Sequence, residues 1–445
     1  MSSESVWSVN IANNTSNKEA MTPQLTTREK VEAGLARRRR KETMFRTIGI
    51  LATGVGIVFL GVFFATLIAK GSSAFVQTFM QLEIFVDEEL IAPGGELDLA
   101  YGDFDGLVRA ALRKEFPDVS SRAERRDLYR LVSVGAGYQL RDLIIADPIL
   151  VGTTVSLWVP ASSNVDMLIK GNIDSALDEN LRTLSDAQIA WVSALEGAGK
   201  LETRFNMALF TNGDSRDPEL AGIKGAMMGS FYMLLVTISL SFPIGVAAAI
   251  YLEEFAPRNR WSDLIEVNIN NLAAVPSIVF GLLGLAVFIN YLSLPRSAPL
   301  VGGLVLTLLT LPVIIIASRA AIKAVPPSIR EAALGLGASE MQVVFHHVLP
   351  LAMPGMLTGA IIGMSRALGE SAPLLMIGMV AFIVDVPGGF TDPATALPVQ
   401  IYLWADSPER AFAERTSAAI IVLLGFLLLM NLAAVIIRKR MERKW

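Results

Sequence analysis

The stretch Ser328–Pro350, SIREAALGLGASEMQVVFHHVLP, is a polar and small-residue segment between two long apolar runs. Two prolines precede it, and Ser328 followed three residues later by Glu331 has the spacing of a capping box. A helix is therefore predicted to begin at Ser328. Gly335 and Gly337 are expected to end this helix after about two turns, because glycine readily adopts the backbone conformation that ends helices.

A second short helix is predicted in the same stretch. Ser339 and Gln342 repeat the capping spacing, and Pro350 is expected to close the helix. Four apolar residues fall at helical spacing, namely Met341, Val344, Phe345 and Val348. The product is a bent helix pair with one apolar stripe, a shape suited to a groove in another protein. An ordinary interfacial helix pair and a DNA-reading helix-turn-helix are the alternatives.

Composition indicates a membrane protein. Of the 445 residues, 52% are hydrophobic and 18% are charged, and the mean hydropathy is +0.49. The absence of cysteine excludes disulfides and thiolate chemistry. The only two histidines are adjacent, so on a helix they point to different faces and a metal site is not expected. A net charge of −4 gives no global indication of nucleic-acid binding.

Six apolar runs are long enough to cross a bilayer. They are Ile48–Ala69, Met227–Leu252, Leu272–Leu292, Leu300–Ser318, roughly 354–383, and Ala418–Ile437. The basic run RRRRK precedes the first span, and RKRMERKW follows the last. Because basic residues mark cytoplasmic segments, both termini are predicted to lie in the cytoplasm, together with the Ser328–Pro350 stretch.

The predicted fold is mainly α and polytopic, with an α+β exported domain inserted between the first and second membrane helices. The expected divisions are a cytoplasmic tail with its basic cluster at 1–47, the first membrane helix at 48–70, an exported periplasmic domain at 71–219, a membrane core of five helices at 220–437, and a basic cytoplasmic tail at 438–445.

The segment 71–219 carries 24 acidic and 13 basic side chains, a net charge of −11. Its pattern predicts a hairpin with arms at 82–86 and 97–101, helices at 106–116, 121–143 and 186–195, and strands at 151–159 and 201–210. An acidic surface repels anions, so this domain is a poor candidate for an anion site. A docking or stabilising insertion and a catalytic domain are both left open.

Two charged residues interrupt the fifth apolar run. Arg366 is expected about 18 Å into a span that begins near Pro354, close to mid-depth, where an unpartnered arginine is costly. Glu370 lies one helical turn later, on the same face. The pair is interpreted as part of an anion pathway, with a structural ion pair between helices as the alternative. Arg319, at the cytoplasmic end of the preceding span, is a second candidate.

Several motifs resemble a known family. Glu331-Ala332-Ala333, followed by Gly337 and then Leu349-Pro350, resembles the EAA loop of the membrane permeases of ABC importers. Three further stretches resemble the A-type permeases of phosphate importers, the PstA family: AVPSIVFGL from Ala274, RALGESAPLL from Arg366 and LPVQIYLW from Leu397. The resemblance covers about residues 221–437, and the large exported insertion departs from the family.

This resemblance implies a six-helix permease subunit of the type I ABC importer architecture, in the cell inner membrane, that translocates inorganic phosphate. It is not expected to be an enzyme or to bind a cofactor, since ATP and Mg²⁺ are used by a partner. The implied partners are a C-type permease subunit in a heterodimer, a cytoplasmic ATPase dimer, a periplasmic phosphate-binding protein and the lipid bilayer, with no nucleic acid.

The resemblance also assigns roles to residues. The ATPase coupling loop at 328–350 would use Glu331, Ala332, Ala333, Gly337, Leu349 and Pro350, and the substrate pathway would use Arg366, Glu370 and Arg319. Two alternative functions remain: a permease for another oxyanion such as phosphonate, sulfate or molybdate, and a membrane receptor with an exported ligand-binding domain.

Overall fold

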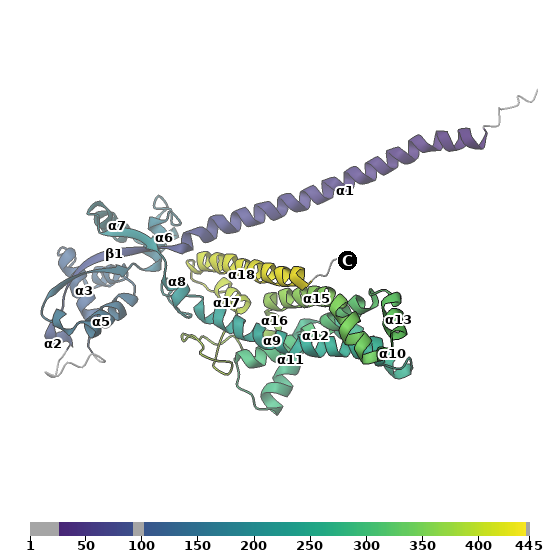
Figure 1. Ribbon diagram of the computed structural model, residues 1–445. Helices are drawn as coiled ribbons and strands as arrows, with labels where there is room; N and C mark the ends of the chain where they lie inside the picture. The colour runs from purple at the N-terminus through teal and green to yellow at the C-terminus, as the bar shows by residue number, and fades with distance from the viewer. Residues whose placement is uncertain (1–25, 92–101, 442–445) are drawn as a thin grey trace, which may run out of the picture. The chain divides into compact units, whose positions relative to one another are not determined.

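The computed structural model describes residues 26–91 and 102–441 (Figure 1). The chain divides into two units, Met1–Ala65 and Thr66–Trp445. The long helix α1 (Thr27–Gly71) begins in the first unit and ends in the second, and it contains the uncharged run that was predicted as the first span. The short 3-10 turn η1 (Ser72–Phe75) leads from this helix into the inserted segment.

A three-stranded antiparallel sheet forms the inserted segment's framework, in the order β2-β1-β3. The central strand is β1 (Val76–Phe85), flanked by β2 (Thr154–Pro160) and β3 (Leu201–Phe205). In β1 the side chains of Met80, Leu82 and Ile84 are fully or almost fully buried, whereas the residues between them are more exposed. This alternation places one face of the sheet against the helices.

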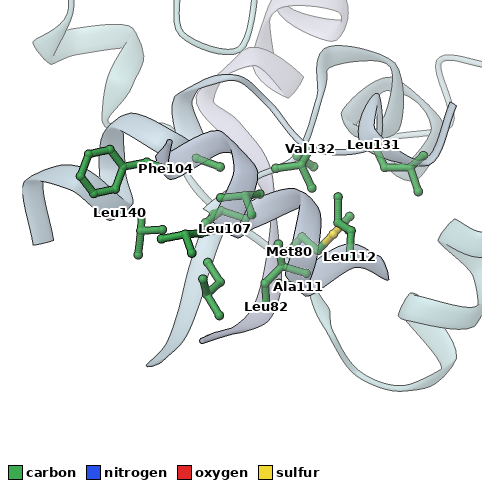
Figure 2. Packing of buried hydrophobic residues seen from close by; sticks show 14 of the residues in the cluster. Met80, Leu82, Phe104, Leu107, Ala111, Leu112, Leu131, Val132 and Leu140 are labelled. Atoms are coloured by element: carbon green, nitrogen blue, oxygen red, sulfur yellow. The ribbon is translucent and has the colours of Figure 1, made fainter. Parts of the chain in front are cut away.

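Helices cover that face and close an apolar core. They are α3 (Phe104–Glu115), α4 (Arg122–Tyr129), α5 (Gly135–Ala146), α6 (Ser163–Ile169) and α7 (Asp186–Gly197), with the short α2 (Glu88–Ile91). The segment also contains the short elements η2 (Pro148–Leu150), η3 (Glu179–Leu181) and α8 (Ala208–Thr211), whose residues lie outside this core. Figure 2 shows Met80 and Leu82 of the sheet beside Leu107 and Leu112 of α3. Burial of these side chains is the main stabilising contribution to this region.

Two expectations for the inserted segment differ from the structure, and a third cannot be compared. The helical pattern at 121–143 is interrupted between Tyr129 and Gly135, giving α4 and α5. The strand expected at 201–210 ends at Phe205, because Asn206 Nδ2 donates to the carbonyl of Ala74 and the chain turns into α8. The second arm of the predicted hairpin lies outside the described residues.

The membrane part is mainly helical in its described length, with its longest non-helical stretch at 377–396. Its elements are α9 (Lys224–Ile250) with the π turn η4 (Tyr251–Phe255), α10 (Arg260–Ala273), α11 (Ser277–Gly284) with the π turn η5 (Leu285–Tyr291), α12 (Pro299–Lys323), α13 (Pro327–Gly335), α14 (Glu340–Gln342), the π turn η6 (Val343–Val348), α15 (Leu349–Gly369), α16 (Ala372–Met376), α17 (Leu397–Ala405) and α18 (Phe412–Met441).

Five helices among the described residues are long and apolar enough to cross a membrane, and a bent pair raises the number to six if it is one span. The bent pair corresponds to the third predicted span, Leu272–Leu292. Its two helices, Arg260–Ala273 and Ser277–Tyr291, meet at 101°. Pro276 lies at the bend, and proline disfavours helical backbone at the residue before it. The third predicted span is therefore a bent helix pair, and its bend was not predicted.

The fifth span is also displaced from its predicted position. It was expected at 354–383, but the continuous helix runs over Glu340–Gly369. Pro350 does not close the preceding helix, because the π turn η6 shifts the backbone pairing so that Leu349 N donates to Val344 O and the helix continues. The helix ends at Gly369, since Pro373 would clash with the carbonyl four residues before it.

Small residues allow α12 and α15 to approach closely. A side chain added at Gly355 would collide with Ala321, and one added at Gly359 would collide with Ala317. Each helix therefore presents two small residues four positions apart to the other, a common way of packing membrane helices. In Figure 1 the ribbons of α9, α12 and α15 lie together, and α12 contacts both of the others.

Candidate functional site

The first candidate region is the helix α13 and the turn after it. The capping box predicted for Ser328 and Glu331 is absent, because α13 begins at Pro327 with Pro326 as its N-cap and no side chain caps it. The helix ends at Gly335 as expected, and Gly337 has a positive φ of 86°. The second box is confirmed: Ser339 Oγ accepts from Gln342 N, and Gln342 Oε1 accepts from Ser339 N at 2.9 Å.

Arg330 attaches α13 to the end of α12. Its Nη1 donates to Val325 O at 2.7 Å, and its Nη2 donates to Ile322 O at 3.0 Å. The same Nη2 lies 2.8 Å from Glu254 Oε1, at the end of α9. The guanidinium thus satisfies carbonyls at the C-terminal end of α12, where a positive charge is favourable. A displacement of α13 would therefore also displace the ends of α12 and α9, to which Arg330 is bonded.

The outer face of this region is partly apolar. Leu336 is 90% exposed, and Leu334, Met341 and Phe345 are also exposed. The predicted stripe is divided, because Val344 and Val348 are buried against the membrane helices whereas Met341 and Phe345 are not. Exposed apolar side chains gathered in this way typically mark a contact surface for another protein.

The expected coupling residues differ in exposure. Glu331 and Ala332 are exposed and Ala333 is buried. Leu349 and Pro350 are half-buried in the first turn of α15. The loop thus combines an exposed acidic start with an end that is continuous with a membrane helix.

Arg319, the second candidate for the anion pathway, lies among carboxylates. Its Nε is 2.5 Å from Glu253 Oε1, and its Nη2 is 2.8 Å from Glu266 Oε2. Lys323 Nζ is 3.3 Å from the same Glu253 oxygen. The side chains of Arg319 and Glu253 are 11% and 10% exposed. The charge of Arg319 is therefore compensated within the chain, by acids from α10 and from the end of α9.

The roles of Glu253, Glu254 and Glu266 as partners of arginines were not predicted from the sequence. Glu253 and Glu254 follow directly on an apolar run, a position where acids are unusual in a segment otherwise marked by basic residues. That anomaly was a usable signal. Glu266 carried no such signal, because its proximity to Arg319 depends on the bend between α10 and α11.

Arg366 has a different environment. Its Nε lies 3.4 Å from Glu370 Oε1, and the two side chains are 42% and 19% exposed. Among the described residues, no other carboxylate lies within 4 Å of Arg366, and no hydrogen bond involves its terminal nitrogens. Hydrogen bonds to an ionised acceptor are strongest at about 2.7 to 2.9 Å, so this contact is a loose one.

Arg366 is near the C-terminal end of its helix. It lies in the last turn of α15, and Glu370 already has extended backbone beyond the helix end. The structure does not bring Arg366 and Arg319 together. Arg319 lies between Ala317 and Ala321, which face Gly355 and Gly359, whereas Arg366 is seven residues beyond Gly359, or about 10 Å along the helix.

A cavity of about 540 Å³ lies between α9, α15 and α18. Its lining is apolar apart from Asn431, whose side-chain oxygen accepts a hydrogen bond from Ser365 Oγ at 2.7 Å. A cavity lined by apolar side chains and one neutral amide, with no cation, is unsuited to an anion. It is more compatible with an acyl chain or an apolar side chain.

A buried charge cluster attaches the inserted segment to α18. Lys170 Nζ lies 2.6 Å from Asp166 Oδ2 and 2.8 Å from Glu414 Oε1, and all three side chains are at most 10% exposed. Asp166 Oδ1 also accepts from Thr78 N, in β1, at 2.7 Å. Because a buried charge is costly without its partner, this cluster fixes the inserted segment to the start of α18.

Two further carboxyl groups near this junction, one half-buried and one buried, have no cation within 4 Å among the described residues. Burial raises the pKa of Asp214, although Trp404 Nε1 donates to its Oδ1 at 2.9 Å. Burial likewise raises the pKa of Glu219, which is 5% exposed. Desolvation disfavours the charged form of a carboxyl group, which is the cause in both cases.

Residues 241–444 match a family described as binding-protein-dependent transport system inner membrane component. Residues 32–179 match a domain of unknown function, DUF3333. The first match contains every candidate pathway and coupling residue, and the second contains most of the inserted segment.

Relatives with curated names match part of the chain. The "Phosphate transport system permease protein PstA 1" of Mycobacterium tuberculosis is 33% identical over 217 residues, which is 49% of this chain and 70% of that protein. The PstA of Haemophilus influenzae is 29% identical over 50% of this chain and 78% of that protein. The "Probable ABC transporter permease protein YqgI" of Bacillus subtilis is 38% identical over 35% of this chain, but the match spans only about half, 52%, of that protein.

Among solved structures, the MetNI methionine ABC transporter matches 48% of this chain and 94% of its own chain, with 19% identity and a TM-score of 0.38. A TM-score of this size is too low to support an assignment, so family membership rests on the sequence matches.

Proposed function

Because the chain belongs to the family of binding-protein-dependent transport system inner membrane components and is close to PstA, we propose that it is the permease subunit through which an ABC importer carries inorganic phosphate into the cell. The chain is a multi-pass membrane transport subunit. The observation that carries the choice of phosphate is the 33% identity to a protein named as a phosphate transport system permease, over 70% of its length.

Arg366 is the side chain that we assign to the phosphate. Its terminal nitrogens are free of other partners among the described residues, and its side chain is 42% exposed. A guanidinium offers parallel donors that fit two oxygens of a phosphate. Glu370 competes for the same guanidinium through a 3.4 Å contact, so it holds Arg366 in place between transport events. A site of this kind admits an anion and also releases it.

The proposal for coupling uses α13 and its exposed face. ATP and Mg²⁺ would be used by a separate cytoplasmic ATPase dimer that binds Glu331, Leu334 and Leu336, and the chain itself would bind no cofactor. Arg330 supports this role, because it joins α13 to α12 and α9 through Ile322 O, Val325 O and Glu254. Closure of the ATPase dimer would thus move the membrane helices and change the side from which the pathway opens.

The remaining partners follow the same proposal. A second permease subunit of the C type would complete the pathway, and a periplasmic binding protein would deliver phosphate. Both termini and α13 would lie in the cytoplasm, and the inserted segment would lie outside.

Transport is tested in proteoliposomes that contain this chain with its co-expressed permease, ATPase and binding protein. Radiolabelled phosphate should accumulate when ATP is supplied on the ATPase side, and excess sulfate, molybdate or phosphonate should not reduce the uptake. Strong competition by one of these other anions, with weak competition by unlabelled phosphate, would reject phosphate as the substrate and leave the transport assignment intact.

Sidedness is tested with single cysteines, since the chain has none of its own. Leu336→Cys in the turn after α13 and Ile149→Cys in the inserted segment place thiols at side chains that are 90% and 83% exposed. An impermeant maleimide added to intact cells should label Ile149→Cys but not Leu336→Cys until the membrane is permeabilised. Labelling of Leu336→Cys in intact cells would contradict a cytoplasmic coupling loop.

A further inference from the structure

The inserted segment carries a row of arginines on one helix. In α4 the residues Arg122, Arg125, Arg126, Tyr129 and Arg130 occupy positions i, i+3, i+4, i+7 and i+8. This is the spacing of a single helical face. The arginines are exposed, whereas Leu128 on another side of the helix is fully buried in the apolar core. One face of α4 is therefore cationic along its whole length.

This face forms the wall of a groove of about 890 Å³. Its lining consists of Arg109, Arg122, Ala123, Arg125, Arg126, Tyr129 and Arg130, so it contains five arginines and no acid. Arg109 comes from α3, and its guanidinium carbon lies 5.9 Å from the centre of the Tyr129 ring. That contact holds a cation from a second helix over the groove without neutralising it. We call these residues the arginine groove.

One acid near the arginine groove pairs with an arginine of the groove, and two others have partners elsewhere. Glu124 closes the capping box of α4, Glu115 lies 2.6 Å from Lys200, and Asp127 lies 3.5 Å from Arg130. Within the described parts of the chain, no carboxylate lies within 4 Å of the guanidinium groups of Arg109 or Arg126.

The same holds for the other two guanidinium groups of the groove. Neither Arg122 nor Arg125 has a carboxylate within 4 Å in the described part of the chain, and Arg125 only donates from Nε to Val119 O, at 3.3 Å. Four positive charges are thus gathered in one groove of a segment whose net charge is −11.

Four neighbouring positive charges are unfavourable unless a bound anion compensates them. Like charges three and four residues apart on a helix repel one another and destabilise it. Neutral polar residues in place of the arginines would serve folding equally well, because the arginines are exposed and only Tyr129 of this face packs against the apolar core. Arginine in place of lysine throughout the groove is also informative, since its planar donors match the paired oxygens of a phosphate group.

We infer that the arginine groove is a binding site for a phosphate-type oxyanion group, either free inorganic phosphate or the phosphate of an anionic lipid headgroup. Arg122 and Arg126, one helical turn apart, donate to its oxygens, and Arg109 closes over it from α3. The site lies outside the family match at 241–444, so it does not depend on which solute the membrane helices transport.

The test compares two double variants of the full-length protein in detergent. Arg122→Gln/Arg126→Gln removes two charges from the groove, whereas Arg113→Gln/Lys114→Gln removes two exposed charges from α3 that do not line it. Inorganic phosphate is titrated calorimetrically against chloride of equal ionic strength. The groove variant should bind phosphate about tenfold more weakly than the wild type, and the control should bind as the wild type does. Arg122→Lys/Arg126→Lys should give an intermediate affinity.

A second arm separates the two sources of phosphate. Full-length protein in nanodiscs is mixed with separate vesicles of 30% phosphatidylglycerol in phosphatidylcholine, or of phosphatidylcholine alone, and the vesicles are floated. A headgroup site is identified if the wild type and the control float with the anionic vesicles and the groove variant does not. A free-anion site is identified if the groove variant binds inorganic phosphate more weakly in the calorimetric titration. If the groove variant equals the wild type in both arms, the inference is wrong, whereas the transport proposal is judged separately by uptake.

Discussion

Arg319 and Arg366 both lie near the C-terminal ends of membrane helices, α12 and α15, yet their surroundings are opposite. Arg319 is 11% exposed and contacts two carboxylates at 2.5 and 2.8 Å. Arg366 is 42% exposed and has one carboxylate at 3.4 Å. The charge of Arg319 is compensated by carboxylates of the same chain. Arg366 keeps N–H donors that can bind a ligand.

The difference distinguishes a structural cation from one that can bind a ligand. An intramembrane arginine is expected to be functional, but an arginine whose donors are already taken by carboxylates contributes to the arrangement of helices instead. The side chains of Glu253, Glu254, Glu266, Arg319 and Arg330 together join α9, α10, α12 and α13. We therefore propose Arg366 as the residue that binds the anion and Arg319 as a structural link between α12, α10 and the end of α9.

The largest expected effect is on transport, at Arg366. Replacement by alanine removes the donors that we assign to phosphate, and hydrogen bonds to charged groups are worth about 1.5 to 3 kcal/mol. The rate of phosphate uptake should therefore fall about tenfold to hundredfold. Uptake by proteoliposomes measures it, and Arg366→Lys, which keeps the charge, should be less impaired. Undiminished phosphate uptake by a correctly assembled Arg366→Ala complex would show that Arg366 does not bind the transported anion.

The next effect concerns the coupling helix. Glu331→Lys reverses an exposed charge beside the apolar face formed by Leu334 and Leu336. Phosphate uptake should fall about tenfold while the partner's ATP hydrolysis continues, because misplaced charge at an interface costs on the order of 1 to 2 kcal/mol. Glu340→Lys, the same change at an exposed residue across the turn, is the control. Equal coupling ratios for both variants and the wild type would refute a docking role for α13.

The third prediction concerns stability, at Arg319. Removing this cation leaves Glu253 nearly buried with only Lys323 nearby, so Arg319→Gln should destabilise the protein by about 2 kcal/mol. Combining it with Glu253→Gln should recover part of the loss, with a coupling energy of about 1 kcal/mol. Thermal unfolding in detergent measures all four members of the cycle. Additive losses would mean that the two side chains do not stabilise one another.

The smallest effect is a pH dependence at Asp214 and Glu219, the two carboxyl groups near the junction that form no ion pair within 4 Å among the described residues. Their raised pKa values mean that the folded state takes up protons before the unfolded state does, whose carboxyl pKa is about 4. Their contribution to stability therefore increases as the pH falls from 7 through the raised pKa, and it is constant below the unfolded pKa.

The double variant Asp214→Asn/Glu219→Gln tests this sign. At pH 7.5 it should unfold at a higher temperature than the wild type, because it removes one buried and one half-buried charge, and the difference should shrink as the pH is lowered towards 4.5. A difference that stays constant across this range would show that the two groups do not titrate as inferred.

The organisation of the membrane part could be predicted from the sequence to a large extent. Apolar length identified all the regions that contain candidate spans, because a bilayer imposes one requirement on every crossing helix. The ends of the helices could not be predicted so well. Pro350 was expected to end a helix and Pro276 was not expected to bend a span, since the effect of a proline depends on the backbone pairing around it.

For the candidate site, the sequence determined which residues carry charge in apolar surroundings, and so it identified Arg366, Glu370 and Arg319. Only the tertiary structure decided their partners. Glu266 reaches Arg319 through the 101° bend, and Glu414 reaches Lys170 from 244 residues away. The charge of a residue follows from its type. Whether that charge is compensated depends on which segments the fold brings within a few ångströms, and the spacing of residues along the chain does not determine those long-range contacts.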